Sequence, residues 1–412
     1  MIISKKSLSI RGIITLPTSK SLSNRALILK EVSQKKLSIK NLSQAEDTTK
    51  LNAILNNLNS SEEEIFNIET DNCGTCIRFL TSFLSIRQGQ FILTGNKRMQ
   101  QRPIGPLVQA LRSLGAKISY IFNDGYVPLF IRGSYIEGGR VEIDCSISSQ
   151  FASSLVLIAP ILNKGLHLFV KNLHSASYLD MTFNFMRQLG LKINKISEFE
   201  YFIPHQQFQL QIYTIPKDWS SASFWYAIFA LTKEGSIILK DLKKCDLQGD
   251  SITAKIYKEL GVNTEFNEQG TELTHSQIKT DFFEKNLNNY PDLAIPLIVN
   301  LILLGISFKI TGLSHLKYKE SNRLKCLQTE LKKIGANLLI NSNGSVSWQK
   351  EKLFFPEKIL FNTYADHRIA MALSQIALFT NIELNNAQRV VKKSYPSFWE
   401  NFNKIFTKSK TQ

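Results

Sequence analysis

Six polar clusters recur along the chain, and each one opens a long apolar stretch. The first two clusters are about fifty residues apart, and the later ones follow at intervals of a little over seventy residues. The clusters occupy residues 20–25, 72–75, 148–150, 220–223, 292–294 and 366–368. A repeat at such a period constrains the architecture more strongly than any local propensity does. Because polar groups at helix starts also bind anions, the same repeat indicates where ligands could bind.

Each cluster is followed by the same succession of expected elements. Stretches that are apolar nearly all round predict buried helices, as at 25–29, 151–161, 224–231 and 370–379. Short β-like runs come next, at 37–40, 91–94, 166–170, 236–240, 306–310 and 381–384. Amphipathic second helices are expected to start near Asp47, Pro103, Tyr178, Gln248, Lys319 and Pro396. Several of these helices should close at a glycine, namely Gly115, Gly190, Gly261 and Gly335.

The six repeats predict an α/β protein of two domains with three repeats each. A strand-like run at 8–16 precedes the first cluster and is expected to belong with the C-terminal half. The predicted domains are therefore residues 1–17 plus 218–412, and residues 18–217. A cleft between two domains is the default place to expect a ligand.

Composition narrows the class of partner. The apolar fraction of 43% is ordinary for a globular protein, and the net charge of +16 suits an anionic partner such as nucleic acid, a membrane surface or a phosphorylated metabolite.

The most apolar stretch, 293–308, is shorter than the roughly 20 residues of a membrane span. The N-terminus lacks the apolar region of a signal peptide. We therefore expect a cytoplasmic protein with no membrane partner.

The five cysteines are an odd number, which argues against a secreted disulfide framework and for a reducing compartment. Cys73 and Cys76 have the spacing of a redox motif or half of a zinc site. Since neither a thioredoxin-like βαβ context nor a second ligand pair accompanies them, we expect ordinary thiols at a helix start.

Three basic clusters in the first half suit a phosphate or a carboxylate. Lys20 and Arg25 flank two serines, Arg78 follows a Gly-Thr pair by one helical turn, and 97–103 carries three cations before a proline. The alternative for each is a capped helix or a basic loop whose cations are solvated.

The second half carries the carboxylates. Lys319, Glu320 and Arg323 are spaced to share one helix face, either as a surface ion pair or as an acid held beside bound phosphates. Asp366 is expected to cap a helix that places His367 and Arg368 in its first turn. Since a cation there opposes the helix dipole, the arrangement favours an anion site. Metal ligation by His367 lacks a second histidine at ligand spacing.

The ordered set of clusters resembles the motifs of the 5-enolpyruvylshikimate-3-phosphate (EPSP) synthase family over essentially the full length. The matching elements are Lys20-Ser21 with Arg25, Asn72-x-Gly74-Thr75-x-x-Arg78, Arg102-Pro103, Ser148-Ser149-Gln150, Ser175 with Tyr178, Asp292, Lys319-Glu320-x-x-Arg323, Asp366-His367-Arg368 and Lys393. The resemblance implies two similar domains, each of three βαβαββ units (an inside-out α/β barrel), with the active site in the interdomain cleft. It implies transfer of the enolpyruvyl group of phosphoenolpyruvate to the 5-hydroxyl of shikimate 3-phosphate, releasing phosphate, in the pathway to chorismate and aromatic amino acids.

Residue roles follow from the same resemblance. Phosphoenolpyruvate would contact Lys20, Asn72, Gly74, Arg102, Gln150, Arg323, Arg368 and Lys393. Shikimate 3-phosphate would contact Lys20, Ser21, Arg25, Ser148, Ser149, Gln150, Ser175, Asp292, His315 and Lys319. Asp292 is the candidate base and Glu320 the candidate acid, with Lys20 assisting. No metal or organic cofactor and no nucleic-acid partner is implied, and we expect a monomer.

Three positions depart from the family pattern, and two other functions compete. Thr18 stands where the family often has Gly, Cys73 where it usually has Ala, and His315 where many members have Asn or Arg. The family with the sister activity, enolpyruvyl transfer to a UDP-sugar, typically carries a cysteine in the loop that corresponds to 97–103, and this loop has none. A nucleic-acid-binding protein would suit the charge, but basic patches interleaved with aromatic residues are lacking.

Overall fold

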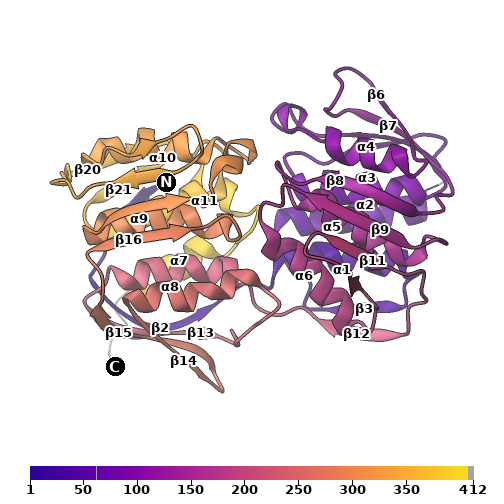
Figure 1. Cartoon of the computed structure of the whole chain (residues 1–412). Helices are drawn as coiled ribbons and strands as arrows, with labels where there is room; N and C mark the ends of the chain where they lie inside the picture. The colour runs from indigo at the N-terminus through magenta and orange to yellow at the C-terminus, as the bar shows by residue number, and fades with distance from the viewer. Residues whose placement is uncertain (62, 407–412) are drawn as a thin grey trace. The chain divides into compact units, whose positions relative to one another are not determined.

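The computed structural model describes residues 1–61 and 63–406, and its chain forms two compact units. Unit 1 consists of Met1–Ser19, Gln44–Glu46 and Pro216–Gln412, and unit 2 consists of Lys20–Ser43 and Asp47–Ile215. Each unit is an α/β structure built from three small sheets in the described residues (Figure 1). The α/β class expected from the repeats is therefore confirmed.

Two sheets of unit 2 share one strand order, in which the first strand of a repeat pairs in parallel with the second and the last two strands follow in antiparallel fashion. The first sheet contains β4 (Phe66–Glu69), β5 (Gly89–Thr94), β6 (Lys117–Tyr120) and β7 (Leu129–Gly133). The second contains β8 (Gly139–Asp144), β9 (Leu166–Lys171), β10 (Asn194–Lys195) and β11 (Glu200–Ile203). The third is the parallel pair β3 (Leu37–Lys40) and β12 (Gln211–Thr214).

Unit 1 repeats the same order in two of its sheets. These contain β2 (Ser9–Thr15), β13 (Glu234–Lys240), β14 (Leu260–Asn267) and β15 (Gly270–Ile278) in one, and β16 (Phe282–Asn286), β17 (Ser307–Thr311), β18 (Leu339–Ile340) and β19 (Val346–Trp348) in the other. The third sheet contains β1 (Ile2–Ile3), β20 (Lys358–Phe361) and β21 (Asn381–Leu384). The six β-like runs expected from the sequence fall on β3, β5, β9, β13, β17 and β21, so these predictions are confirmed.

Two strands join sheets far from their place in the chain. The N-terminal strand β2 pairs in parallel with β13, and Figure 1 shows it in indigo beside that much later strand. In unit 2, β12 pairs with the early strand β3. In each of these two sheets, the position of a repeat's first strand is filled by a strand from a distant part of the chain, β2 beside β13 and β12 beside β3.

The first helix of each repeat is buried nearly all round. These helices are α1 (Lys20–Val32), α3 (Gly74–Ile86) and α5 (Gln150–Ile158) in unit 2, and α7 (Trp219–Ala230), α9 (Ala294–Leu304) and α11 (His367–Leu373) in unit 1. Within each unit they pack on one another, α1 and α3 on α5, and α7 and α11 on α9. Because most of their neighbours are apolar, charged side chains lie chiefly at their starts, and inner polar groups such as Ser154 and Asn300 are paired by hydrogen bonds. The functional side chains consequently gather at helix N-termini.

The second helices are amphipathic. They are α2 (Glu46–Ser60), α4 (Gly105–Ser113), α6 (Ala176–Gln188), α8 (Thr253–Glu259), α10 (Arg323–Leu331) and α13 (Phe398–Phe406), and a short additional helix, α12 (Ala387–Val391), precedes α13. The four glycines expected to close a helix all have positive φ, at +99° for Gly115, +76° for Gly190, +86° for Gly261 and +82° for Gly335. That conformation favours glycine and confirms this part of the prediction.

One expected helix is wrong in its start. Lys319, Glu320 and Arg323 were expected on one helix face, but a short 3-10 turn, η5 (Ser314–Tyr318), ends before Lys319, and α10 begins only at Arg323. The reason is local, because the Asn322 side chain accepts a hydrogen bond from the Lys325 amide and caps α10 there. Within residues 1–61 and 63–406, no helix is long and apolar enough to cross a membrane.

Candidate active site

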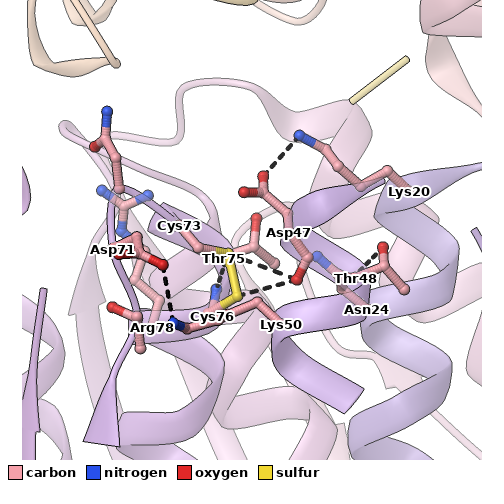
Figure 2. The surroundings of a disulfide bond; sticks show 12 residues. Lys20, Asn24, Asp47, Thr48, Lys50, Asp71, Cys73, Thr75, Cys76 and Arg78 are labelled. Atoms are coloured by element: carbon pink, nitrogen blue, oxygen red, sulfur yellow. Dashed lines mark hydrogen bonds and ion pairs between the residues drawn. A yellow bond between two sulfur atoms is a disulfide. The ribbon is translucent and has the colours of Figure 1, made fainter. Parts of the chain in front are cut away.

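The start of α3 in unit 2 contains a disulfide between Cys73 and Cys76 (Figure 2). The expectation of two ordinary thiols is wrong, because the first turn of α3 brings the two side chains together. Cys73 is the N-cap, and its Sγ accepts a hydrogen bond of 3.1 Å from the Cys76 amide. Both side chains are buried, whereas Cys145, Cys245 and Cys326 are free thiols.

Lys20, at the first position of α1, forms an ion pair with Asp47 at the start of α2. The Lys20 Nζ and an Asp47 carboxylate oxygen are 2.9 Å apart, and both side chains are largely buried. Figure 2 shows this pair next to the disulfide, and the Asp47 carbonyl oxygen lies 3.3 Å from the Cys76 Sγ. The sequence identified Lys20 but missed Asp47, although its place at the start of a second helix was a usable signal.

Arg102 lies directly over Gly74. A Cβ added to Gly74 would lie only 2.6 Å from the Arg102 Nη2, so glycine is required for this close approach. The Arg102 Nη1 donates to the Asn72 side-chain oxygen at 3.2 Å and to the Asn72 carbonyl at 3.4 Å. The structure therefore brings together the expected residues Asn72, Gly74 and Arg102 at the start of α3.

Gln150, at the first position of α5, connects to the same helix. Its side-chain oxygen accepts from Arg78 at 2.7 Å, and its side-chain amide donates to the Thr75 hydroxyl at 3.1 Å. The Gln150 backbone amide donates to the Ser148 hydroxyl. Ser149 is the N-cap of α5 and is buried. The starts of α3 and α5 thus form one polar surface in unit 2.

Arg25 is an expected substrate contact that the structure places inside unit 2. Its guanidinium is 1% exposed and donates to the Thr182 hydroxyl and to the carbonyl oxygens of Ser21 and Tyr178. Burial lowers the pKa of Arg25 to about 10. The guanidinium therefore stays charged at neutral pH while it ties α1 to α6. Ser175 has a positive φ of 58° and is the N-cap of α6.

Arg323 is the centre of the cluster in unit 1. Its guanidinium lies 2.9 Å from Asp366, 2.8 Å from Glu320 and 3.2 Å from Asp292, counting nitrogen to carboxylate oxygen. Burial alone would lower the pKa of Arg323, but the three carboxylates outweigh it and raise the pKa above its usual value. Asp366 also caps α11 by accepting from the Arg368 amide, which confirms its expected role.

Arg368 reaches Asp292 from the start of α11. Its Nη2 donates to the Asp292 carboxylate at 2.8 Å and to the Ser220 hydroxyl at 2.7 Å, while Nη1 donates to the Asp292 carbonyl at 3.0 Å. Asp292 lies in the 3-10 turn η4 (Pro291–Leu293) and so contacts both arginines. The sequence assigned no partner to Ser220, so its contact with Arg368 was not predicted.

Asp250 is a second carboxyl group that the sequence did not single out. It lies in the 3-10 turn η3 (Gly249–Ile252) and is buried. Burial, and next the charge of Asp292, raise the pKa of Asp250 to about 7, although Arg368 and the Ser220 hydroxyl act in the opposite direction. In sequence, an Asp just before the second helix of a repeat resembles an ordinary helix cap. The sequence context therefore did not mark Asp250 as a candidate functional residue.

The remaining candidates lie near the unit 1 cluster in sequence. His315 is buried in η5, Lys319 follows that turn, and Lys393 follows α12 with its side chain partly buried. His367, at the first position of α11, is 2% exposed. The described part of the chain contains no group of three or more His, Cys, Asp or Glu side chains that could hold a metal ion.

Two chemical capacities follow from this geometry. The start of α3, with Lys20 and Arg102 nearby, presents cations and helix amides to an anion. The unit 1 cluster holds Asp292 and Glu320 in fixed positions by ion pairs with buried arginines. Carboxyl groups held in this way can transfer protons beside a bound anion.

Comparison with known proteins identifies relatives over the full length. A family model described as EPSP synthase (3-phosphoshikimate 1-carboxyvinyltransferase) matches residues 4–402. A 3-phosphoshikimate 1-carboxyvinyltransferase from Bacteroides fragilis is 37% identical over 397 residues, covering 96% of this chain and 95% of its own. One from Buchnera aphidicola subsp. Cinara cedri is 35% identical over 425 residues, with 96% and 95% covered.

The fold comparison agrees with the sequence comparison. A solved EPSP synthase from Acinetobacter baumannii superimposes with a TM-score of 0.74 at 19% identity, covering 98% of each chain. At this level of identity the likeness establishes a common fold. The expected two-domain architecture of βαβαββ units is thereby confirmed.

Proposed function

The chain belongs to the EPSP synthase family of 3-phosphoshikimate 1-carboxyvinyltransferases, and we propose that the polar clusters of its two units perform that family's reaction. The enzyme is a transferase of the shikimate pathway, on the route to aromatic amino acids. The enolpyruvyl group of phosphoenolpyruvate is joined to the 5-hydroxyl of shikimate 3-phosphate, and phosphate is released. One observation supports this proposal most, namely that Arg323 and Arg368 hold the same carboxylate, Asp292, beside Glu320.

Phosphoenolpyruvate carries a phosphate and a carboxylate, so its site needs several cations. In unit 2 we assign Lys20, Gln150, and the Asn72, Gly74 and Arg102 group at the start of α3. Arg102 and Lys20 are engaged with protein oxygens in the structure, and an anion would compete for the same donors. In unit 1 we assign Arg323, Arg368 and Lys393.

Shikimate 3-phosphate offers a phosphate, a carboxylate and hydroxyl groups. We assign its contacts to Lys20, Ser21, Ser148, Ser149, Gln150, Ser175, Asp292, His315 and Lys319. We assign Arg25 a positioning role instead of a ligand contact, because its guanidinium is bonded to α6 rather than open to a ligand. We propose that it positions Ser21, whose carbonyl it binds, and the start of α6.

The reaction requires two proton movements in its first step. Asp292 would accept the proton of the attacking 5-hydroxyl, and Glu320 would deliver a proton to the methylene carbon of phosphoenolpyruvate. The resulting tetrahedral intermediate carries both the phosphate and the new C–O bond. Its breakdown breaks the C–O bond to phosphate and returns a proton from the methyl group, which regenerates the double bond. Lys20, Arg323 and Arg368 would stabilise the charge on the departing phosphate.

We further infer a cytoplasmic monomer that needs no metal or organic cofactor. The inference rests on the sequence composition and the family resemblance. Size-exclusion chromatography with light scattering tests the oligomeric state, and turnover in the presence of a chelator tests the metal requirement. A dimeric mass or loss of turnover with chelator would contradict the corresponding part.

The function is tested by measuring phosphate release from phosphoenolpyruvate with different acceptors. Release that depends on shikimate 3-phosphate is the expected result. Release that depends on a UDP-sugar would instead assign the sister activity. Binding of DNA or RNA without either reaction would favour the nucleic-acid-binding alternative that the net charge of +16 allows.

A further inference from the structure

We propose that Cys73 and Cys76 form a reversible thiol–disulfide site whose oxidation weakens the binding of phosphoenolpyruvate. The proposal rests on the proposed function, which places phosphoenolpyruvate at the start of α3. The disulfide (Figure 2) closes a ring that includes Gly74 and Thr75. Gly74 lies beside Arg102, and Thr75 accepts a hydrogen bond from Gln150. A bond made or broken in this ring must therefore act on the backbone that faces Arg102.

The first consequence concerns the amide of Cys76. The Cys73 Sγ accepts this N–H at 3.1 Å, so the oxidised pair fixes a sulfur on one of the first amides of α3. The first amides of a helix lack partners within the helix and are the donors that an anion uses. In the reduced protein the Cys73 side chain can rotate about its own χ1, which releases the Cys76 amide. Reduction thus adds a donor for phosphoenolpyruvate.

The second consequence concerns Asp47, which holds Lys20. The Asp47 carbonyl oxygen lies 3.3 Å from the Cys76 Sγ and 4.0 Å from the Cys73 Sγ. A disulfide sulfur has no hydrogen to donate, whereas a thiol at either position can donate to this carbonyl. Reduction therefore forms a new hydrogen bond to the residue whose carboxylate positions the Lys20 ammonium 2.9 Å away. The first effect frees an amide at the start of α3, and the second acts on the ion-pair partner of Lys20, which is assigned to phosphoenolpyruvate.

The chemistry is thiol–disulfide exchange with a small-molecule disulfide such as glutathione disulfide. One cysteine thiolate attacks the external disulfide, forms a mixed disulfide and releases one thiol. The second cysteine then attacks the protein sulfur and releases a second thiol, so two cysteine thiols are oxidised and one external disulfide is reduced. Both cysteines are buried, and the exposed Asp71 lies two residues before Cys73, so exchange requires the turn at 71–75 to open.

Two of the other cysteines are poor partners for exchange. Burial raises the pKa of Cys145 to about 12 and the pKa of Cys326 to about 11, so both thiolates are scarce at neutral pH. Cys245 is the half-buried thiol among the three free cysteines. It therefore serves as the control for oxidation elsewhere in the chain.

The test equilibrates the full-length protein in glutathione buffers of different ratio and measures the KM for phosphoenolpyruvate at saturating shikimate 3-phosphate. The oxidised fraction of Cys73–Cys76 is measured in each sample by alkylation and peptide mass spectrometry. We expect the KM to rise at least about fivefold on oxidation. Cys73→Ala and Cys76→Ala should show no response to the oxidant, whereas Cys245→Ser should respond like the unaltered protein.

Failure of the switch can be distinguished from failure of the proposed function. An unchanged KM in samples of verified oxidised fraction overturns the switch while the function stands. If neither form turns over, the function fails, and the redox equilibrium is then measured with both ligands present. By linkage, ligands that prefer the reduced pair must lower its oxidised fraction by the same factor. Asp292→Asn slows turnover enough to allow this measurement, and an unshifted equilibrium overturns the switch.

Discussion

Arg323 donates through its Nε to a carboxylate oxygen of Asp366 over 2.9 Å, and neither side chain is more than 2% exposed. The same Asp366 accepts from the Ser321 hydroxyl and from the Arg368 amide at the start of α11. Asp366 is thus the buried anchor that fixes both arginines of the unit 1 cluster. A buried charge that loses its partner costs far more free energy than an exposed one. We therefore expect the Arg323–Asp366 pair to stay closed, which holds the cluster in one arrangement.

Removing one partner of this pair should destabilise unit 1 strongly. We expect Arg323→Met to lower the free energy of unfolding by about 3–5 kcal/mol, because Asp366 would remain buried without its guanidinium. Urea denaturation followed by tryptophan fluorescence measures the change. Lys309→Met is the matched control, because its ion pair with Glu284 is about half exposed and should contribute less than about 1 kcal/mol. Equal losses in the two variants would contradict the role of burial.

The proton-transfer roles predict a separation of turnover from binding. We expect Asp292→Asn and Glu320→Gln each to lower kcat by about 10²–10⁴-fold, because each amide keeps the shape but cannot take up or supply the proton. Calorimetric titration with shikimate 3-phosphate should still detect binding in both variants. A variant with near-normal kcat would remove that residue from the mechanism.

Asp250 should give the stability of the protein a characteristic pH dependence. Its pKa is raised from 3.8 to about 7, so between these values the folded protein keeps a proton that the unfolded chain has released. The free energy of unfolding should therefore fall as the pH rises from about 4 to about 7, by at most about 1.4 kcal/mol per pH unit from this group.

The matched variant for this dependence is Asp250→Asn, which lacks the titrating proton. The difference in unfolding free energy between the two proteins, measured by urea denaturation across the pH range, should favour the unaltered protein most at low pH and level off above about pH 7. A difference that is constant with pH would show that folding does not raise the pKa of Asp250.

The contact between Gly74 and Arg102 predicts a defect specific to one substrate. In Gly74→Ala the new methyl group would lie 2.6 Å from the Arg102 Nη2, so the guanidinium must move. We expect kcat/KM for phosphoenolpyruvate to fall by about 10- to 100-fold, with little change in the KM for shikimate 3-phosphate. Gly105→Ala, whose new Cβ would lie 3.3 Å from Gly125, is the control within unit 2. Comparable defects in both variants would indicate a general loss of structure.

The repeat in the sequence predicts the fold well because it reflects local physics. Apolar stretches that lack a polar face have to be buried, as α5 and α9 are, and the alternating runs after them form the strands β9 and β17. The start of α10 was misplaced because the Asn322 cap competes with helix formation at Lys319 and Glu320. Periodicity alone cannot decide between a cap and one further helical turn.

The site is less predictable than the fold because its contacts join distant segments. Ser220 binds Arg368 across 148 residues of sequence, and Arg25 reaches Thr182 across 157. A hydroxyl in a helix-start cluster and an arginine near one look alike in sequence whether they face a ligand or the interior. The disulfide was missed for a different reason, because composition indicated a reducing compartment while the turn at Cys73 and Cys76 brings the sulfurs together regardless.

The central claim is that the chain forms a C–O bond between phosphoenolpyruvate and shikimate 3-phosphate. Mass spectrometry of the acceptor after incubation with both compounds, together with the phosphate released, tests it most directly. We expect a shikimate 3-phosphate that carries one added carboxyvinyl group, formed in equal amount with phosphate and formed about 10²–10⁴-fold more slowly when Asp292→Asn replaces the unaltered enzyme. Unmodified shikimate 3-phosphate after prolonged incubation with the reduced, folded protein would contradict the account.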